Sequence, residues 1–143
     1  MKSKSVSGPS QRSWMLVFES EDEPVALLTQ FADANDIAAA SISGIGGFAE
    51  VTLGYFSLQK REYERIPVRE QVEVMSLTGN IARFEGKAKL HVHVVIGKSD
   101  GSAHGGHLLD ARVKPTLEVV VMELPGELHR TVDPVTGLPL LRP

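Results

Sequence analysis

Four of the five histidines lie within one short stretch of the chain, at spacings that could hold a metal ion. His91 and His93 stand two residues apart in the segment 87–96, where Leu, Val and Ile occupy the alternate positions. A period of two is typical of a β-strand and places both imidazoles on the same face. Two imidazoles so placed can chelate one cation, although such a pair can also be half-buried and simply hydrogen-bonded. The pair therefore points to a metal site on a strand.

The segment that follows this strand offers further ligands. His104 and His107 flank Gly105 and Gly106, and two glycines allow close backbone approach or a positive φ. Because the chain has no cysteine, any transition metal must be held by nitrogen and oxygen ligands, and neutral imidazoles suit zinc. We predict that His107 joins the strand pair as a ligand of zinc or another divalent metal. We predict His104 as a fourth ligand or as a group that contacts the ligands. With three protein ligands, one coordination position on the metal would stay open for water or substrate.

Three other motifs do not predict a cofactor site. Residues 44–49 match the G-x-G-x-x-A dinucleotide pattern, but they are followed by alternating residues rather than by the helix that the pattern requires. These glycines are more typical of a bend or bulge. Residues 97–99 resemble the end of a P-loop, yet Val92 stands where its first glycine should be. A cupin-like site would need a glutamate after the second histidine, and residues 94–99 contain none.

One helix and at least six strands must position these residues. Apolar residues at helical spacing after Pro24 predict a helix over 24–35. A second, shorter helix is considered over 108–113, where the following Lys-Pro argues against a long one. Apolar runs and strand periodicity occur over 14–18, 38–45, 48–58, 72–78, 87–96 and 116–124. This order predicts an α+β domain on a mostly antiparallel sheet.

Length and charge indicate one domain with a basic tail. A chain of 143 residues fits a single domain. Residues 1–13 carry three basic and no acidic side chains, so the rest of the chain, with 12 basic and 18 acidic side chains, has a formal charge of −6. We predict a disordered basic tail over 1–13 and a single domain over 14–143. The tail lacks the apolar region of a signal peptide and no apolar run approaches the ~18 residues of a membrane span, so we expect a cytoplasmic location and no membrane partner.

The charge pattern argues against strong nonspecific binding of nucleic acid. An acidic body does not neutralise phosphates, and the basic side chains are interleaved with acidic ones, as in the segment 60–65. No helix-turn-helix, zinc finger or RNA-recognition signature is visible. The candidates for phosphate contact are Lys60, Arg61, Arg65, Arg69, Arg83, Lys87, Lys89, Arg112 and Lys114.

Taken in order, several segments resemble the PPC/PCC domain, the plant and prokaryote conserved domain. The specific part is the His91-Val92-His93 motif followed at this spacing by Gly105-Gly106-His107-Leu108. The resemblance covers roughly residues 14–142. The supporting segments are 44–47 with 51–55, 74–81, 100–101 and 136–138.

This resemblance implies a fold, an assembly and a function. The fold would be α+β, a strongly bent, mostly antiparallel sheet with one main helix packed on it. Family members assemble as homotrimers, and some carry a metal held by histidines that correspond to His91, His93 and His107. Prokaryotic members are described as DNA-binding by analogy with plant relatives, in which AT-hooks precede the domain. This chain has no Arg-Gly-Arg-Pro hook, so it resembles the stand-alone prokaryotic form.

Three hypotheses follow for the function. The first is a homotrimeric DNA-binding or regulatory protein with a three-histidine metal site. The second is a zinc-dependent enzyme of unknown reaction, in which Glu118 or Glu123 could act as a base. The third is an assembly module that binds a small ligand. The sequence leaves catalysis open and favours a non-catalytic function.

Overall fold

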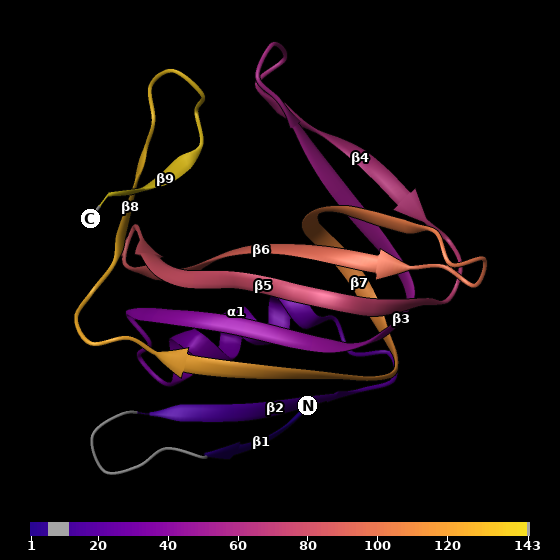
Figure 1. Cartoon of the computed structure of the whole chain (residues 1–143). Helices are drawn as coiled ribbons and strands as arrows, with labels where there is room; N and C mark the ends of the chain where they lie inside the picture. Colours follow the sequence, from indigo (N-terminus) through magenta and orange to yellow (C-terminus); the bar gives the residue numbers. More distant parts are fainter. Residues whose placement is uncertain (6–11, 143) are drawn as a thin grey trace.

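The structure is a computed structural model that describes residues 1–5 and 12–142. Within these ranges it contains one helix and nine strands of a single sheet (Figure 1). The predicted α+β class, with a mostly antiparallel sheet and one main helix, is confirmed; only the short contact between β5 and β8 is parallel. The elements are β1 (Lys2–Ser5), β2 (Ser13–Glu19), α1 (Pro24–Ala34), β3 (Ala39–Ser57), β4 (Glu62–Val68), β5 (Val72–Phe84), β6 (Lys87–Gly97), β7 (Ala103–Glu123), β8 (His129–Val132) and β9 (Pro139–Arg142).

Two long strands, β3 and β7, connect the parts of the sheet. β3 pairs with β5 through its first half and with β4 through its second, while β7 pairs with β2, β3 and β6. Register shifts interrupt the pairing of β3 with both β5 and β7, and each shift lets a strand bend. At Gly46 a Cβ atom would lie 2.4 Å from the carbonyl oxygen of Thr116, so only glycine fits there. The glycine motif at 44–49 lies within β3, where the register shift between Gly44 and Gly46 agrees with the expected bulge. The two strands expected over 38–45 and 48–58 form one continuous strand.

The helix forms where the sequence predicts it. The Glu23 carboxylate caps its first turn by accepting hydrogen bonds from the backbone N–H groups of Val25 and Ala26, and Pro24 begins the helix. Leu28 and Ala32 are fully buried because α1 packs against β6 and β7. β6 buries every second side chain in the core, from Ala88 to Ile96, which leaves the odd-numbered positions on its other face.

Two expectations from the sequence differ from the structure. Residues 108–113 are not helical but belong to β7, because they pair with β3, for example Ala111 with Val51. In the segment expected to be a disordered tail, Lys2–Ser5 form β1 and pair with β2. The remainder of that expectation, over 6–11, lies outside the described residues. In the described part of the chain, no helix is long and apolar enough to cross a membrane.

Candidate metal centre

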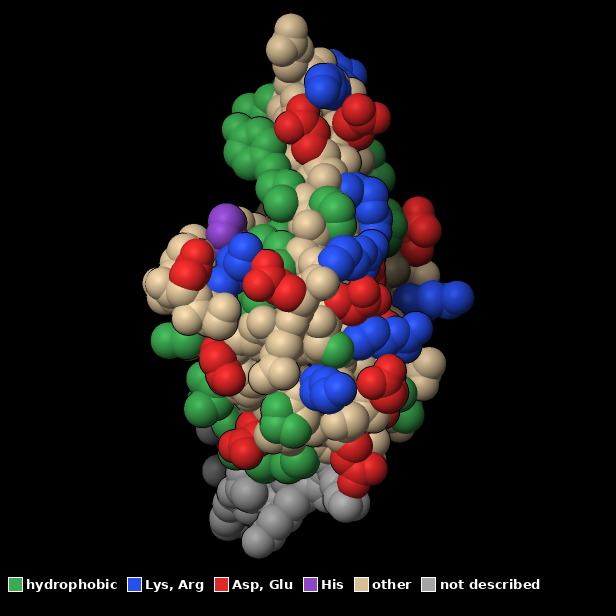
Figure 2. Space-filling model, turned by 90° about the vertical axis from the view of Figure 1, so that its right-hand side faces the viewer, with side chains coloured by type: hydrophobic (Ala, Val, Ile, Leu, Met, Phe, Trp, Pro, Cys, Tyr) green, Lys and Arg blue, Asp and Glu red, His purple; other side chains and the backbone are tan. Residues whose placement is uncertain are grey.

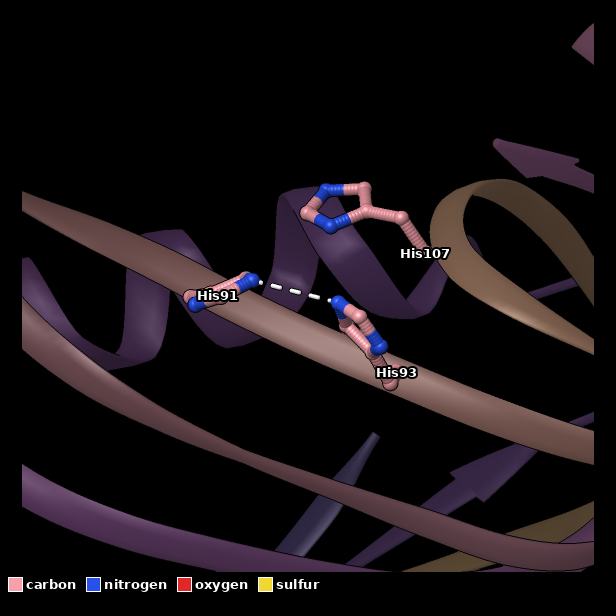
Figure 3. Close-up of side chains that lie close together, drawn as sticks. All are labelled: His91, His93 and His107. Carbon is pink, nitrogen blue, oxygen red and sulfur yellow. Dashed lines mark hydrogen bonds between the residues drawn. The ribbon is translucent and has the colours of Figure 1, made fainter. Parts of the chain in front are cut away.

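Three histidines from two neighbouring strands converge on one point. His91 and His93 lie on β6, and His107 lies on β7, where the pairing register places it directly opposite His93. One ring nitrogen from each lies within 4.8 Å of the others. The Nε2 atoms of His91 and His93 are 3.2 Å apart, and the three rings turn their nitrogens toward one another (Figure 3). The structure thus brings together the three side chains that the sequence analysis selected.

His104 lies outside this cluster. It pairs with Ile96, so the alternation of β6 and β7 places it on the opposite face from His93 and His107. Gly105 and Gly106 separate the two β7 histidines and serve the strand packing. A Cβ atom at Gly106 would lie 3.0 Å from the carbonyl oxygen of Gly54, so glycine lets β7 approach β3 closely at this point.

Tyr63 of β4 supports the third histidine, and the sequence analysis did not find it. Its ring packs on the His107 ring with centroids 4.8 Å apart, and its hydroxyl lies 3.5 Å from Nδ1 of His107. A Cβ atom at Gly54 would lie 2.8 Å from the Tyr63 ring, so this glycine leaves room for the aromatic pair. Nothing in the local sequence signals this contact, because β4 reaches β7 only through the shared pairing with β3.

The surroundings favour the neutral form of two of the imidazoles, those of His107 and His91. Burial, followed by smaller contributions from the neighbouring His91, His93 and Lys89, lowers the pKa of His107 to about 4. Burial also lowers the pKa of His91, with smaller contributions from Arg130 and His93. Neutral imidazole is the form that binds a metal ion. The imidazoles of His91 and His107 could therefore coordinate a metal ion at neutral pH without first losing protons.

The donor set fits a divalent metal. Two nitrogens that are bonded to a tetrahedral zinc ion at 2.0–2.1 Å lie about 3.3 Å apart. The 3.2 Å between the Nε2 atoms of His91 and His93 matches this separation. Three nitrogens with no thiolate form the type of ligand set that zinc uses in open sites. The group could therefore hold a metal with at least one further coordination position available.

A cavity of about 450 Å³ adjoins the histidine cluster. His91 and His107 line it, together with side chains of α1 and β6 and of the C-terminal hairpin formed by β8 and β9. Arg130 of β8 is among the lining residues, and the sequence analysis had not singled it out. The carboxylates considered earlier as a base lie elsewhere. Glu118 lines a different hollow on the sheet, and Glu123 forms an ion pair with Arg12 at 2.5 Å.

The basic residues considered for phosphate contact lie on a surface of mixed charge. Figure 2 shows one face of the molecule, on which Lys and Arg side chains alternate with Asp and Glu. Several of the candidates are neutralised by an acidic neighbour. The pairs are Lys60 with Glu64 at 2.8 Å, Arg65 with Asp110 at 2.5 Å, Arg69 with Glu50 at 3.2 Å and Arg83 with Asp33 at 3.3 Å.

The fold and the cluster define a class of small α+β proteins with a three-histidine site on a bent antiparallel sheet. The chain belongs to the Plants and Prokaryotes Conserved (PCC) domain family, whose sequence model matches residues 5–125. The family resemblance seen in the sequence is thereby confirmed. A comparison with curated proteins finds no match.

Solved structures with the same fold cover nearly the whole chain. A "putative dna binding protein" from Bacteroides thetaiotaomicron is 32% identical, with a TM-score of 0.90 over 98% of this chain and 96% of the other. A metal-containing protein from Archaeoglobus fulgidus is 36% identical, with a TM-score of 0.85 over 92% and 93%. A plant- and prokaryote-conserved (PPC) protein from Pyrococcus horikoshii is 31% identical, with a TM-score of 0.88 over 94% of each chain.

Proposed function

We propose that this chain is a homotrimeric PCC-domain protein that holds a divalent metal, zinc in the first place, and acts as a cytoplasmic DNA-binding regulatory protein. The observation that carries the proposal is the convergence of three imidazole nitrogens from His91, His93 and His107 within 4.8 Å. The metal content of the related Archaeoglobus protein supports the same assignment. Bound there, the metal would supply a positive charge and an open coordination position beside the cavity.

The metal assignment is tested by a competition titration against a chromophoric chelator. We expect the His91→Ala/His93→Ala double variant to bind zinc at least about a hundredfold more weakly than the unmodified chain, because two of three ligands are gone. The matched control is His104→Ala, which removes a histidine that lies outside the cluster. Equal zinc affinity in the double variant and the unmodified chain would show that His91 and His93 do not bind the metal.

An apolar hollow on the sheet supports the proposed homotrimer. Ile45 and Met75 are 59% and 62% exposed and line a hollow of about 390 Å³ together with Met15 and Val120. Exposed apolar patches of this kind mark protein–protein contacts. Light scattering should give a trimer for the unmodified chain and smaller species for Met75→Lys. Val135→Lys is the control, because Val135 is 70% exposed but lies in the C-terminal turn. A monomeric unmodified chain would contradict the assembly.

DNA binding is proposed because the related Bacteroides protein is described in those terms. Contacts to phosphate would have to use basic side chains outside the ion pairs of Lys60, Arg65, Arg69 and Arg83, such as Lys87 and Lys114. If about six phosphates are contacted, affinity should fall about a thousandfold between roughly 50 and 200 mM salt. Retention of a mixed DNA duplex in a gel-shift series at rising salt tests this. Absence of binding at the lowest salt would contradict it.

A second candidate function is zinc-dependent catalysis, and the cavity beside the cluster favours it. Zinc lowers the pKa of a bound water to about 7, which yields a nucleophile at neutral pH. This chain's residues would contribute by holding a substrate in the cavity against His91 and His107. Hydrolysis of a 4-nitrophenyl ester provides the readout. Turnover that requires zinc and disappears in His91→Ala/His93→Ala would support it, and turnover that is equal in both proteins would exclude this site.

A further inference from the structure

The cavity beside the histidines is closed by a part of the chain beyond the segment that the family model matches. That match ends at residue 125, whereas Arg130, Pro139 and Leu140 of the C-terminal hairpin form one wall. The other walls come from α1 and β6 and from β7. A volume of about 450 Å³ is within the range of small-molecule sites, which is about 300–1,000 Å³. The hairpin thus turns an open histidine cluster into a pocket.

Arg130 is a buried cation without an anionic partner. It is only 8% exposed. Its Nη1 donates to the carbonyl oxygen of Pro139 at 3.1 Å, its Nη2 donates to Oδ1 of Asn80 at 2.5 Å, and its Nε is buried with no acceptor. Among the described residues, no carboxylate forms an ion pair with this guanidinium, although Arg142 of the same hairpin pairs with Asp133. A buried charge that is satisfied only by neutral acceptors is costly, which calls for a functional reason.

The charge of the pocket points to an anion. Two cationic side chains, Arg130 and Lys89, line it, and no Asp or Glu is among the lining residues. A metal at the cluster would add further positive charge. An entering carboxylate would give Arg130 the charged partner that the fold does not supply.

Apart from the two cations, the histidines, Thr29 and Tyr63, the side chains that line the pocket are apolar. Val25 of α1, Leu90 of β6, Leu109 of β7 and Leu138 and Leu140 of the hairpin line it. We propose that the pocket binds a small organic carboxylate, with its carboxylate on Arg130 and its apolar body between α1 and the hairpin. Only the additional attraction that a metal at the histidines would exert on the carboxylate rests on the proposed function. The contact with Arg130 does not depend on a metal.

Calorimetric titration with hexanoate tests the inference, with hexanamide and hexylamine as neutral and cationic probes of similar size. We expect hexanoate to bind at least about tenfold more tightly than hexanamide, and hexylamine not to bind measurably. Arg130→Gln should abolish this preference, while Arg130→Lys should keep part of it. Arg142→Gln is the matched control from the same hairpin and should bind hexanoate as the unmodified chain does. Equal binding of hexanoate and hexanamide by the unmodified chain would overturn the proposal.

A second variant keeps the test decisive if Arg130→Gln does not fold. Leu140 is 37% exposed at the rim of the cavity, so Leu140→Trp can fill the pocket without removing a buried group. We expect it to lose hexanoate binding while its melting temperature stays close to that of the unmodified chain. Hexanoate binding by a well-folded Leu140→Trp variant that equals that of the unmodified chain would place the ligand elsewhere and overturn the inference.

Titrations of metal-free and zinc-loaded protein separate this inference from the proposed function. Hexanoate binding by metal-free protein, together with failure of the zinc titration, would refute the metal assignment alone. Zinc binding with no preference for hexanoate would refute the carboxylate pocket alone. If both hold, zinc should tighten hexanoate binding, and hexanoate should tighten zinc binding by the same factor.

Discussion

The polar groups around the cavity and those on the charged outer surface are arranged in opposite ways. On the outer surface, Arg65 and Arg69 each form an ion pair with a carboxylate from another segment of the chain, Asp110 and Glu50 respectively. Around the cavity, the three histidines and Arg130 have no acidic partner among the described residues, although Arg130 is almost completely buried. Exposed ion pairs contribute little to stability, so the first arrangement is a solvated surface. The second arrangement leaves the histidines and Arg130 without a charged partner from the chain itself. A bound metal or anion could supply that partner, so this arrangement indicates a binding site.

The largest expected effect is stabilisation by the metal. A ligand that binds only the folded state at about 100 times its Kd raises the free energy of unfolding by about 2.7 kcal/mol. Urea unfolding of the unmodified chain with and without zinc should show a difference of this size. His104→Ala should show the same difference. If zinc stabilised His91→Ala/His93→Ala as much as the unmodified chain, the histidine cluster would not be the metal site that distinguishes the cavity from the outer surface.

The next effect is a pH dependence of the metal-free protein. Because the pKa of His107 is about 4 in the folded state and 6.5 ordinarily, the unfolded chain binds more protons between these values. The stability that comes from keeping this imidazole neutral is present above about pH 6.5 and is lost as the pH falls toward 4. With allowance for solvent screening, the free energy of unfolding falls by about 2 kcal/mol over this range. His107→Gln should lack this component in urea unfolding between these pH values, and an identical pH profile would contradict the burial of His107.

A smaller effect is expected at the aromatic support. Tyr63→Leu removes the ring that packs on His107 and should lower the free energy of unfolding by about 1 kcal/mol. Tyr63→Phe keeps the ring and loses only the hydroxyl contact at 3.5 Å, so it should stay close to the unmodified chain. Thermal unfolding of the two metal-free variants provides the comparison. Equal losses would show that the hydroxyl, and not the ring, supports the histidine.

The smallest effect is expected on the charged surface. Arg65→Gln breaks an ion pair whose side chains are 61% and 45% exposed, so its cost should be below about 0.5 kcal/mol. Chemical unfolding at low and at high salt measures it. A cost that exceeds that of Arg130→Gln would reverse the ranking of the two regions. In that case the exposed ion pairs would contribute more to the free energy of unfolding than Arg130 does.

The histidine cluster could be predicted because its signal is local. The alternation of β6 fixes the face shared by His91 and His93, and His107 follows them closely in the sequence, beside two glycines. The family resemblance implies the same three histidines. Arg130 and Tyr63 could not be predicted, since each reaches the site through strand pairings between distant segments. The same physics explains the incorrect helix over 108–113. Residues 108–113 have no strong intrinsic preference for helix or strand, so their pairing with β3 determines their conformation.

Anomalous X-ray scattering at the zinc absorption edge, from crystals grown with zinc, tests the three-histidine metal site most directly. We expect one strong peak bonded to nitrogens of His91, His93 and His107, with the remaining coordination position facing the cavity. A zinc peak at other residues, or none at this cluster in fully folded protein, would contradict it.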